Sequence, residues 1–262
     1  MVDLSCCIWA LAGDEQTKLT EAARLGFRQI DIQPGMLADG AALALADSLG
    51  LTVRCVGLSF GLAADVALDS ADEVARQAAI QQANDGLETA AQLGADAAYV
   101  VPTFDADPAA LARYGASLQQ LATAAAAHGI KVCIEHFPGR ALPTAAATLA
   151  FIKGLGHDNL YLLLDLGHLQ MSGEDPAAVI QAAGNRLGYV HLDDNDGVGD
   201  LHWALLDGVM TEASLGAALA ALREVGYGGP LSLELSPRLP DVPTALTHSA
   251  TTVRRLLSLA GF

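Results

Sequence analysis

The chain alternates between short runs of apolar residues and longer segments in which alanine and polar residues mix. The apolar runs are rich in Val, Ile, Leu and Cys, and most of them are continuous rather than alternating with polar residues. Strands that are buried on both faces of a parallel sheet show this pattern. Strands are predicted at 4–9, 28–32, 51–58, 97–101, 130–135, 160–165, 187–192 and 231–235.

The segments between these runs carry the signals of helix ends. Several begin next to an aspartate or a proline, which favours a helix start, and they end at or shortly before a glycine, which favours a helix end. Helices are predicted at 14–25, 38–49, 71–93, 108–128, 143–153, 176–183, 212–225 and 243–259.

Strand and helix alternate in order along the whole chain, with no linker or low-complexity stretch between them. This order predicts a single α/β domain over residues 1–262, folded as one (β/α)8 TIM barrel, for which the length is common. An open doubly wound sheet is the alternative. That fold usually has a glycine-rich phosphate-binding turn after its first strand, where this chain reads WALAGDE.

Composition narrows the range of partners. Of the 262 residues, 52% are hydrophobic, which is enough for a large core, and the formal net charge is −16. Such a charge repels nucleic-acid phosphates and anionic lipid surfaces, and no run of about 18 apolar residues suggests a membrane span. We therefore expect neither nucleic acid nor a membrane as a partner.

The cysteines and the start of the chain bear on location. All four cysteines lie in apolar runs and none forms a CxxC pair, which favours reduced core residues. The start MVDLSCCIWA has no basic region ahead of its apolar run, so it does not resemble a signal peptide. We expect a cytoplasmic protein. The apolar composition is compatible with a homo-oligomer but indicates no interface.

Four consecutive predicted strands carry coordinating side chains near their carboxyl ends: Glu135, Asp165, His191 and Glu234. Neighbouring strands lie about 4.8 Å apart, so these groups converge on one volume. Each could be explained alone, as a salt-bridged strand end, a helix cap or a core histidine. Together, the three carboxylates cannot all stay ionised without shared protons or a cation. The set favours one divalent metal, Mn²⁺, Mg²⁺, Co²⁺ or Zn²⁺.

The sequence around these strand ends resembles a known family. The motifs are IE at 134–135, DLGH at 165–168, VHLDDNDG at 190–197, DLH at 200–202 and LSLE at 231–234. Over essentially its whole length, the chain is similar to the xylose isomerase-like TIM barrels, also called the sugar phosphate isomerase/epimerase family.

This resemblance assigns roles to particular residues. It implies that Glu135, Asp165, His191 and Glu234 bind the metal, and that His168 of the D-x-x-H motif contacts the substrate. In related ketose 3-epimerases, the equivalents of Glu135 and Glu234 are also the acid–base pair.

These roles point to proton-transfer chemistry. A metal that chelates two adjacent oxygens of a hydroxy-carbonyl compound stabilises an enediolate, while one glutamate removes a proton and the other returns one. The first hypothesis is a sugar isomerase or epimerase acting on a ketose, aldose, cyclitol or sugar acid. A metal-dependent dehydratase of a keto-cyclitol or dehydroshikimate-like acid is the second, and a non-catalytic sugar-binding barrel is the third.

Some family features are missing. Ketose 3-epimerases typically have an arginine in the loop that here reads DDNDGVGDLHW, which contains none. True xylose isomerases use a lysine and a second metal for a hydride shift. The lysines of this chain, Lys18, Lys131 and Lys153, lie in predicted helices or at the start of a predicted strand, so a hydride shift is less supported. Only Arg140 and Arg238 are expected on the loops at the carboxyl ends of the strands. With so few cations there, we expect an unphosphorylated substrate.

Further substrate-contact candidates come from the same loops. Asp200 and His202 resemble the D-x-H that binds an additional zinc in endonuclease IV-type repair enzymes, but the histidines which those enzymes need after the second and third strands are missing here. We therefore expect His202 to contact substrate or to shape its loop. His136 should point away from Glu135. The other candidates, each with a structural alternative, are Trp9, Phe60, Asp193, Asn195 and Arg238.

Overall fold

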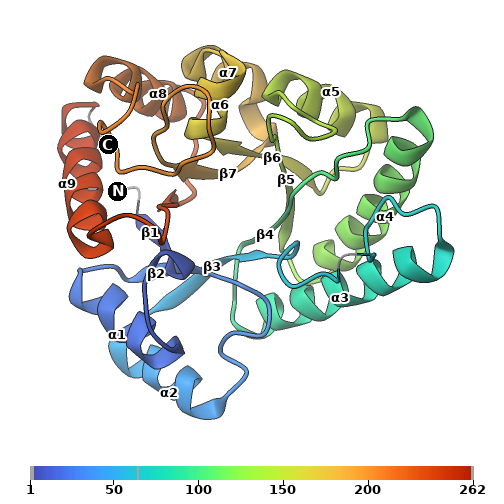
Figure 1. Ribbon diagram of the computed structural model, residues 1–262, viewed down its shortest axis with the longest axis horizontal. Helices are drawn as coiled ribbons and strands as arrows, with labels where there is room; N and C mark the ends of the chain where they lie inside the picture. The colour runs from blue at the N-terminus through green and yellow to red at the C-terminus, as the bar shows by residue number, and fades with distance from the viewer. Residues whose placement is uncertain (1–2, 64, 261–262) are drawn as a thin grey trace.

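The computed structural model describes residues 3–63 and 65–260 (Figure 1). The predicted domain 1–262 also includes residues 1–2, 64 and 261–262, which lie outside this described part. Parallel strands form a closed barrel in the order β1 to β8, and the helices surround it, which confirms the predicted (β/α)8 fold. The strands are β1 (Leu4–Cys7), β2 (Gln29–Ile32), β3 (Thr52–Gly57), β4 (Ala97–Val100), β5 (Lys131–Glu135), β6 (Leu160–Asp165), β7 (Leu187–Leu192) and β8 (Leu231–Leu233).

Each predicted helix is present in the predicted order, some of their ends differ, and one further helix, Leu166–Ser172, was not predicted. They are α1 (Glu15–Arg24), α2 (Gly40–Leu49), α3 (Glu73–Gln92), α4 (Pro108–Ala126), α5 (Ala145–Leu155), α6 (Leu166–Ser172), α7 (Pro176–Ala183), α8 (Glu212–Glu224) and α9 (Val242–Ala260), with short 3-10 helices at Ile8–Ala10 and Gly184–Arg186. None of the helices in the described residues is long and apolar enough to cross a membrane.

Several element ends differ from the prediction; for example, the predicted strand 4–9 ends at Cys7, and residues Ile8–Ala10 form a 3-10 helix. Three further differences lie in α5, β8 and α6. Helix α5 passes through Gly154 and ends at Gly156, which adopts the left-handed conformation with φ 65°. Strand β8 ends at Leu233, so Glu234 is the first residue after the strand. Helix α6 was not predicted, and it begins directly after β6 because the Asp165 side chain caps it.

Two layers of apolar side chains hold the barrel together. The larger layer lies between the strands and the helices. The smaller one fills the barrel interior, where Tyr99, Cys133, Leu163 and Tyr189 are almost completely buried. All four cysteines are buried and free. The interior packing closes the barrel below the carboxyl ends of the strands, so the loops above it can form a cavity.

Candidate active site

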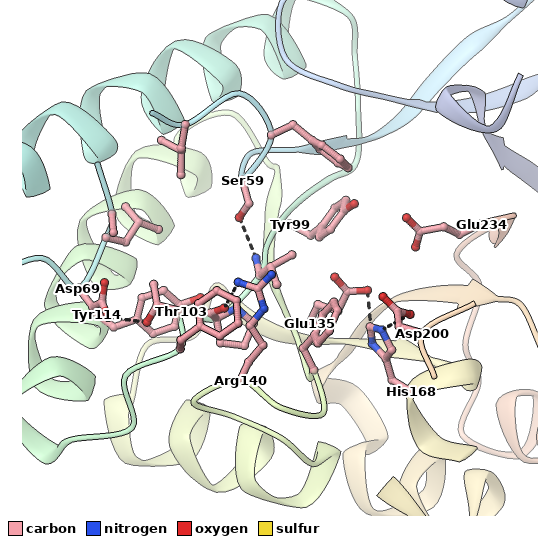
Figure 2. A pocket seen from close by; sticks show the side chains of 18 of the residues that line it. Ser59, Asp69, Tyr99, Thr103, Tyr114, Glu135, Arg140, His168, Asp200 and Glu234 are labelled. Carbon is pink, nitrogen blue, oxygen red and sulfur yellow. Dashed lines mark hydrogen bonds and ion pairs between the residues drawn. The ribbon is translucent and has the colours of Figure 1, made fainter. Parts of the chain in front are cut away.

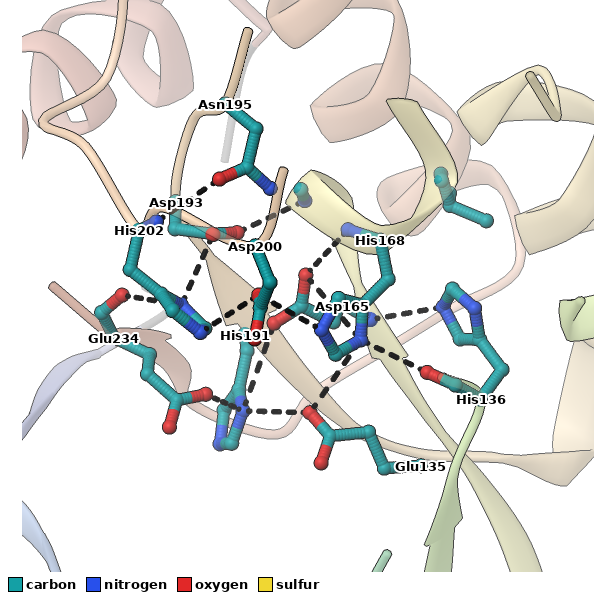
Figure 3. A network of polar contacts seen from close by, with 12 residues as sticks. Glu135, His136, Asp165, His168, His191, Asp193, Asn195, Asp200, His202 and Glu234 are labelled. Carbon is teal, nitrogen blue, oxygen red and sulfur yellow. Dashed lines mark hydrogen bonds and ion pairs between the residues drawn. The ribbon is translucent and has the colours of Figure 1, made fainter. Parts of the chain in front are cut away.

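The structure brings the four predicted metal ligands together. Glu135 and Asp165 end β5 and β6, His191 lies in β7, and Glu234 follows β8. One possible ligand atom from each lies within 4.8 Å of the others, and all four side chains are buried (Figure 3).

The Nδ1 atom of His191 faces three carboxylates at once. It lies 2.6 Å from Glu234 Oε2, 3.7 Å from Glu135 Oε1 and 4.0 Å from Asp165 Oδ2. One imidazole nitrogen offers a single proton or lone pair, so it cannot satisfy three oxygens. Asp165 Oδ2 has no hydrogen-bond partner in the described residues. Three carboxylates and one imidazole are a donor set that divalent cations accept, and a buried orphan oxygen is costly without one. The residues therefore fit a divalent metal.

The two oxygens of Asp165 have different surroundings. Its Oδ1 accepts a hydrogen bond from the His168 backbone N–H at 2.8 Å and caps α6, while its Oδ2 stays free beside His191. Burial raises the pKa of Asp165, and the nearby Asp193 carboxylate raises it further. A bound cation would stabilise the charged form of this side chain.

Asp31 lies behind His191 and was not identified from sequence. It is fully buried on β2, and its Oδ1 accepts hydrogen bonds from Ser5 Oγ at 2.9 Å and Tyr189 OH at 2.6 Å. Its Oδ2 is 3.8 Å from His191 Nε2, on the side of the ring opposite the carboxylate cluster. A carboxylate in this place orients a ligand imidazole. Burial raises the pKa of Asp31, and His191 opposes that shift.

His168 and His202 both contact Asp200. Their Nε2 atoms lie 3.2 Å and 3.0 Å from Asp200 Oδ1. Nδ1 of His168 also lies 2.8 Å from the His136 carbonyl oxygen. Burial lowers the pKa of His168, but Asp165 and Asp200 outweigh it and raise that pKa to about 10. A protonated His168 donates from both nitrogens, which fixes the ring at the edge of the cavity.

Asp193 and Asn195, which were predicted to contact substrate, instead bond to the segments that carry His168 and His202. Asp193 Oδ1 accepts from the Gly167 backbone N–H at 2.8 Å, and its Oδ2 lies 3.0 Å from His202 Nδ1. Asn195 Oδ1 accepts from the backbone N–H groups of Leu201 at 2.6 Å and His202 at 2.9 Å. Both side chains are fully buried, and neither is among the described residues that line the cavity. The structure thus places Asp193 and Asn195 as supports of the His202 loop.

Gly167 explains part of the DLGH motif. A Cβ atom at this position would collide with the side chains of Asp193 and Asn195. The absence of a side chain therefore lets the start of α6 approach the loop after β7. His136 supports the same region: its Nε2 accepts from the Asp165 backbone N–H at 3.3 Å, and burial lowers the pKa of His136 to about 3.

A cavity of about 780 Å³ opens above the carboxylate cluster (Figure 2). Trp9 and Phe60 form part of its wall, with ring centroids 5.1 Å apart, as the sequence led us to expect. Arg140 also lines it, with its guanidinium 4.0 Å from the Phe104 ring centroid. Arg238 is exposed and is not among the described lining residues, so the structure places Arg140 and not Arg238 at the cavity. The remaining predicted contacts that line the cavity are Glu135, His168, His202 and Glu234.

The model of one family, described as the xylose isomerase-like TIM barrel, matches residues 19–255. The chain therefore belongs to this family, which confirms the resemblance seen in the sequence motifs.

Curated and solved relatives include sugar epimerases. The chain is 30% identical over 213 residues to an L-ribulose 3-epimerase of Mesorhizobium japonicum, an alignment that covers 74% of this chain and 65% of the relative. A solved L-ribulose 3-epimerase structure superimposes with a TM-score of 0.84 at 23% identity, covering 99% of this chain and 96% of that one.

A shorter alignment relates the chain to a lyase. Over 77 residues it is 34% identical to an inosose dehydratase of Clostridium beijerinckii, covering 29% of this chain and 26% of that protein. The chain thus covers less than two thirds of the length of both curated relatives.

Proposed function

We propose that the protein is a divalent-metal-dependent isomerase or epimerase of an unphosphorylated sugar, cyclitol or sugar acid. The observation that carries this proposal is the placement of Glu135 and Glu234 on either side of His191, with both carboxylates lining the cavity (Figure 3). The similarity to L-ribulose 3-epimerases supports the same chemistry.

The two glutamates divide the proton transfer between them. A bound divalent metal would supply Lewis-acid polarisation of the substrate carbonyl. Glu135, at the end of β5, and Glu234, directly after β8, would then lie near the neighbouring carbon, so that one carboxylate removes its proton and the other returns a proton. In the metal-free protein, burial raises the pKa of Glu234, but the protonated His191 outweighs it and lowers that pKa. When His191 instead binds the metal, the cation would keep Glu234 ionised, so that this carboxylate can act as the base.

Isotope exchange tests this function directly. The protein would be incubated in D2O with Mn²⁺ or Co²⁺ and a panel of free ketoses, aldoses, keto-cyclitols and ketose disaccharides, with L-ribulose and D-psicose first. We expect deuterium at a carbon next to the carbonyl and a new sugar isomer, both detected by NMR. A folded protein that binds the metal but exchanges no proton on any of these compounds would contradict the proposal.

Glutamine variants test the two carboxylates. Glu135→Gln and Glu234→Gln should each lower turnover by at least about 100-fold, because general acid–base catalysis typically contributes this much. Glu88→Gln, on the exposed face of α3, is the matched control and should retain full activity. Full activity in Glu234→Gln would exclude the two-glutamate mechanism.

The second candidate is a dehydratase, which the similarity to inosose dehydratase favours. The same proton removal would then be followed by loss of a hydroxyl group from the next carbon. In the NMR experiment, a keto-cyclitol would lose water instead of forming an epimer, so one assay distinguishes the two reactions.

A further inference from the structure

The cavity extends well beyond the carboxylate cluster. Glu135, His168 and Glu234 lie at one end, and Asp69, Thr103 and Tyr114 line the other (Figure 2). A six-carbon sugar has only about twelve non-hydrogen atoms, whereas pockets of about 300–1,000 Å³ hold drug-sized ligands. At about 780 Å³, the cavity is larger than a single sugar ring at the reacting end needs.

The far end contains a polar group that lacks a partner. Tyr114 on α4 is completely buried, lines the cavity, and its hydroxyl makes no hydrogen bond to any residue that the structure describes. Buried polar groups rarely remain unpaired, so the hydroxyl calls for a partner in the cavity. Burial raises the pKa of Tyr114, with Asp69 adding to the shift, so the hydroxyl keeps its proton and can donate it.

Asp69 is the second polar group of this end. Its side chain is largely buried, and its Oδ2 accepts a hydrogen bond from Thr103 Oγ1 at 2.5 Å. A carboxylate has room for more than one such bond, so Asp69 can accept another from a ligand hydroxyl. Arg113 Nε donates a hydrogen bond to the Asp69 backbone carbonyl at 2.7 Å, and Ser117 Oγ donates one to the Leu68 backbone carbonyl at 2.7 Å. The loop that carries Asp69 is therefore fixed against α4 before any ligand binds.

Aromatic side chains line the passage between the two ends. Phe60 and Tyr99 stand edge to face with centroids 6.5 Å apart, and Arg140 lies over the rings of Phe104 and Phe137 at 4.0 Å and 5.0 Å. Trp9 packs against Phe60. Flat apolar faces of this kind suit the apolar faces of sugar rings.

We propose that Asp69, Thr103, Tyr114 and Arg140 form a second subsite that binds a hydroxylated ring attached to the reacting sugar. The substrate would then be a glycoside-like compound rather than a free monosaccharide. This inference rests on the proposed function for the identity of the reacting ring. The Asp69 carboxylate would repel an anionic ligand group at this end of the cavity. Together, this carboxylate and the Tyr114 hydroxyl can form hydrogen bonds with the neutral hydroxyl groups of a sugar ring.

Two ketose disaccharides provide the probes. Isomaltulose carries a glucose on O6 of fructose and lactulose carries a galactose on O4, and both leave the carbons around the carbonyl free. Saturation-transfer NMR on the complete protein, without added metal, reports which ring of each disaccharide touches the protein. D-Fructose serves as the single-ring comparison.

Tyr114→Phe removes only the hydroxyl, and Asp69→Asn removes the charge while keeping an acceptor for Thr103. The matched control is Tyr161→Phe, at the start of β6 and away from the cavity lining. In the unchanged protein, we expect both rings of at least one disaccharide to receive saturation. Tyr114→Phe should weaken disaccharide binding about three- to tenfold and Asp69→Asn about tenfold, with fructose unaffected.

The outcomes separate this proposal from the proposed function. Saturation of the fructose ring alone, no binding of either disaccharide, or variants that bind as the unchanged protein does would overturn the second subsite. Binding of both rings that depends on Tyr114, without isotope exchange on any sugar, would sustain the subsite and contradict the proposed reaction.

Discussion

At the end of the buried strand β6, the two carboxylate oxygens of Asp165 have different surroundings. One oxygen caps α6, and the other faces the cluster of Glu135, His191 and Glu234 with no hydrogen-bond partner among the residues that the structure describes. The cap holds the carboxylate in a fixed orientation, which leaves the free oxygen directed at the site. The structural and the metal-binding interpretations of this residue are therefore compatible, and substitution can separate them.

The substitution Asp165→Asn should separate the capping role of this side chain from the effect of its negative charge on metal binding. Asp165→Asn keeps a good capping side chain, so α6 should persist, whereas Asp165→Ala also loses the cap, at about 1 kcal/mol in the free energy of unfolding. Both variants should bind Mn²⁺ at least about tenfold more weakly, because a charged oxygen is lost from the cluster. Calorimetric titration of metal and urea denaturation would measure the two effects. Normal metal affinity in Asp165→Asn would contradict the assignment.

Asp31 offers a second test at the same scale. Its carboxylate lies 3.8 Å from His191 Nε2, behind the ring that faces the cluster, so it acts as a positioning residue. Asp31→Asn should weaken metal binding about 10- to 100-fold, as loss of a carboxylate behind a ligand histidine typically does. Ser5→Ala removes one of the hydrogen bonds to Asp31 and should have a smaller effect. A change in the visible spectrum of bound Co²⁺ would report the altered ligand geometry, and an unchanged affinity and spectrum would exclude the positioning role.

The sequence predicted the candidate metal ligands but not the residues that position them. The four strand-end ligands could be found because chain order alone places them on neighbouring strands. Asp31 could not, since its contacts with His191 and Tyr189 depend on which side chains point inward across the barrel. Asp193 and Asn195 occur in the right loop, but only the fold shows that Asp193 accepts from the Gly167 backbone of α6 and that Asn195 accepts from the backbone of its own loop.

At the scale of elements, the loop after β7 is organised around Asp194. This buried carboxylate accepts hydrogen bonds from the backbone N–H groups of Leu206, Gly208 and Met210 at 2.8–3.0 Å, and from Gln170 Nε2 at 3.0 Å. The loop carries Asp200 and His202 to the cavity, so its shape depends on a side chain that does not reach the cavity itself.

Asp194→Ala should therefore destabilise the protein and disturb the site together. One buried and two partly buried backbone N–H groups would lose their acceptor. At about 1–3 kcal/mol for each group left unsatisfied, we expect a loss of about 3 kcal/mol. Chemical denaturation measures this loss. Asp196→Ala, in the exposed part of the same loop, is the control and should cost less than about 1 kcal/mol. A similar small effect in Asp194→Ala would show that the loop does not depend on this carboxylate.

Element boundaries also show where local signals become ambiguous. Gly154 and Gly156 both lie at the end of α5, and the helix continues through the first because a glycine inside a helix costs only about 1 kcal/mol. Helix α6 is too short to leave a periodic pattern in the sequence, and its start depends on the Asp165 cap. Chain-wide alternation predicted the barrel well because it rests on many elements at once.

At the scale of the whole molecule, a negative net charge accompanies a cluster of buried carboxylates that could hold a cation. The chain has a formal charge of −16, and buried carboxylates meet at the carboxyl ends of the strands. Such a field attracts divalent cations to the cavity. Burial lowers the pKa of His191, but the nearby Glu234 and Glu135 carboxylates outweigh it and raise that pKa well above its usual range in the metal-free protein.

Metal binding should therefore stabilise the entire fold. A ligand that binds only the folded state adds about 2.7 kcal/mol at 100 times its dissociation constant, so Mn²⁺ at that excess should raise the melting temperature by several degrees. Removal of metal with a chelator should lower the melting temperature, and re-addition should restore it. In Asp165→Asn, the same Mn²⁺ concentration should give a much smaller rise, because the ligand cluster is incomplete. An equal rise in both proteins would mean that the cation stabilises the fold by screening the surface charge and not by binding at the four strand ends.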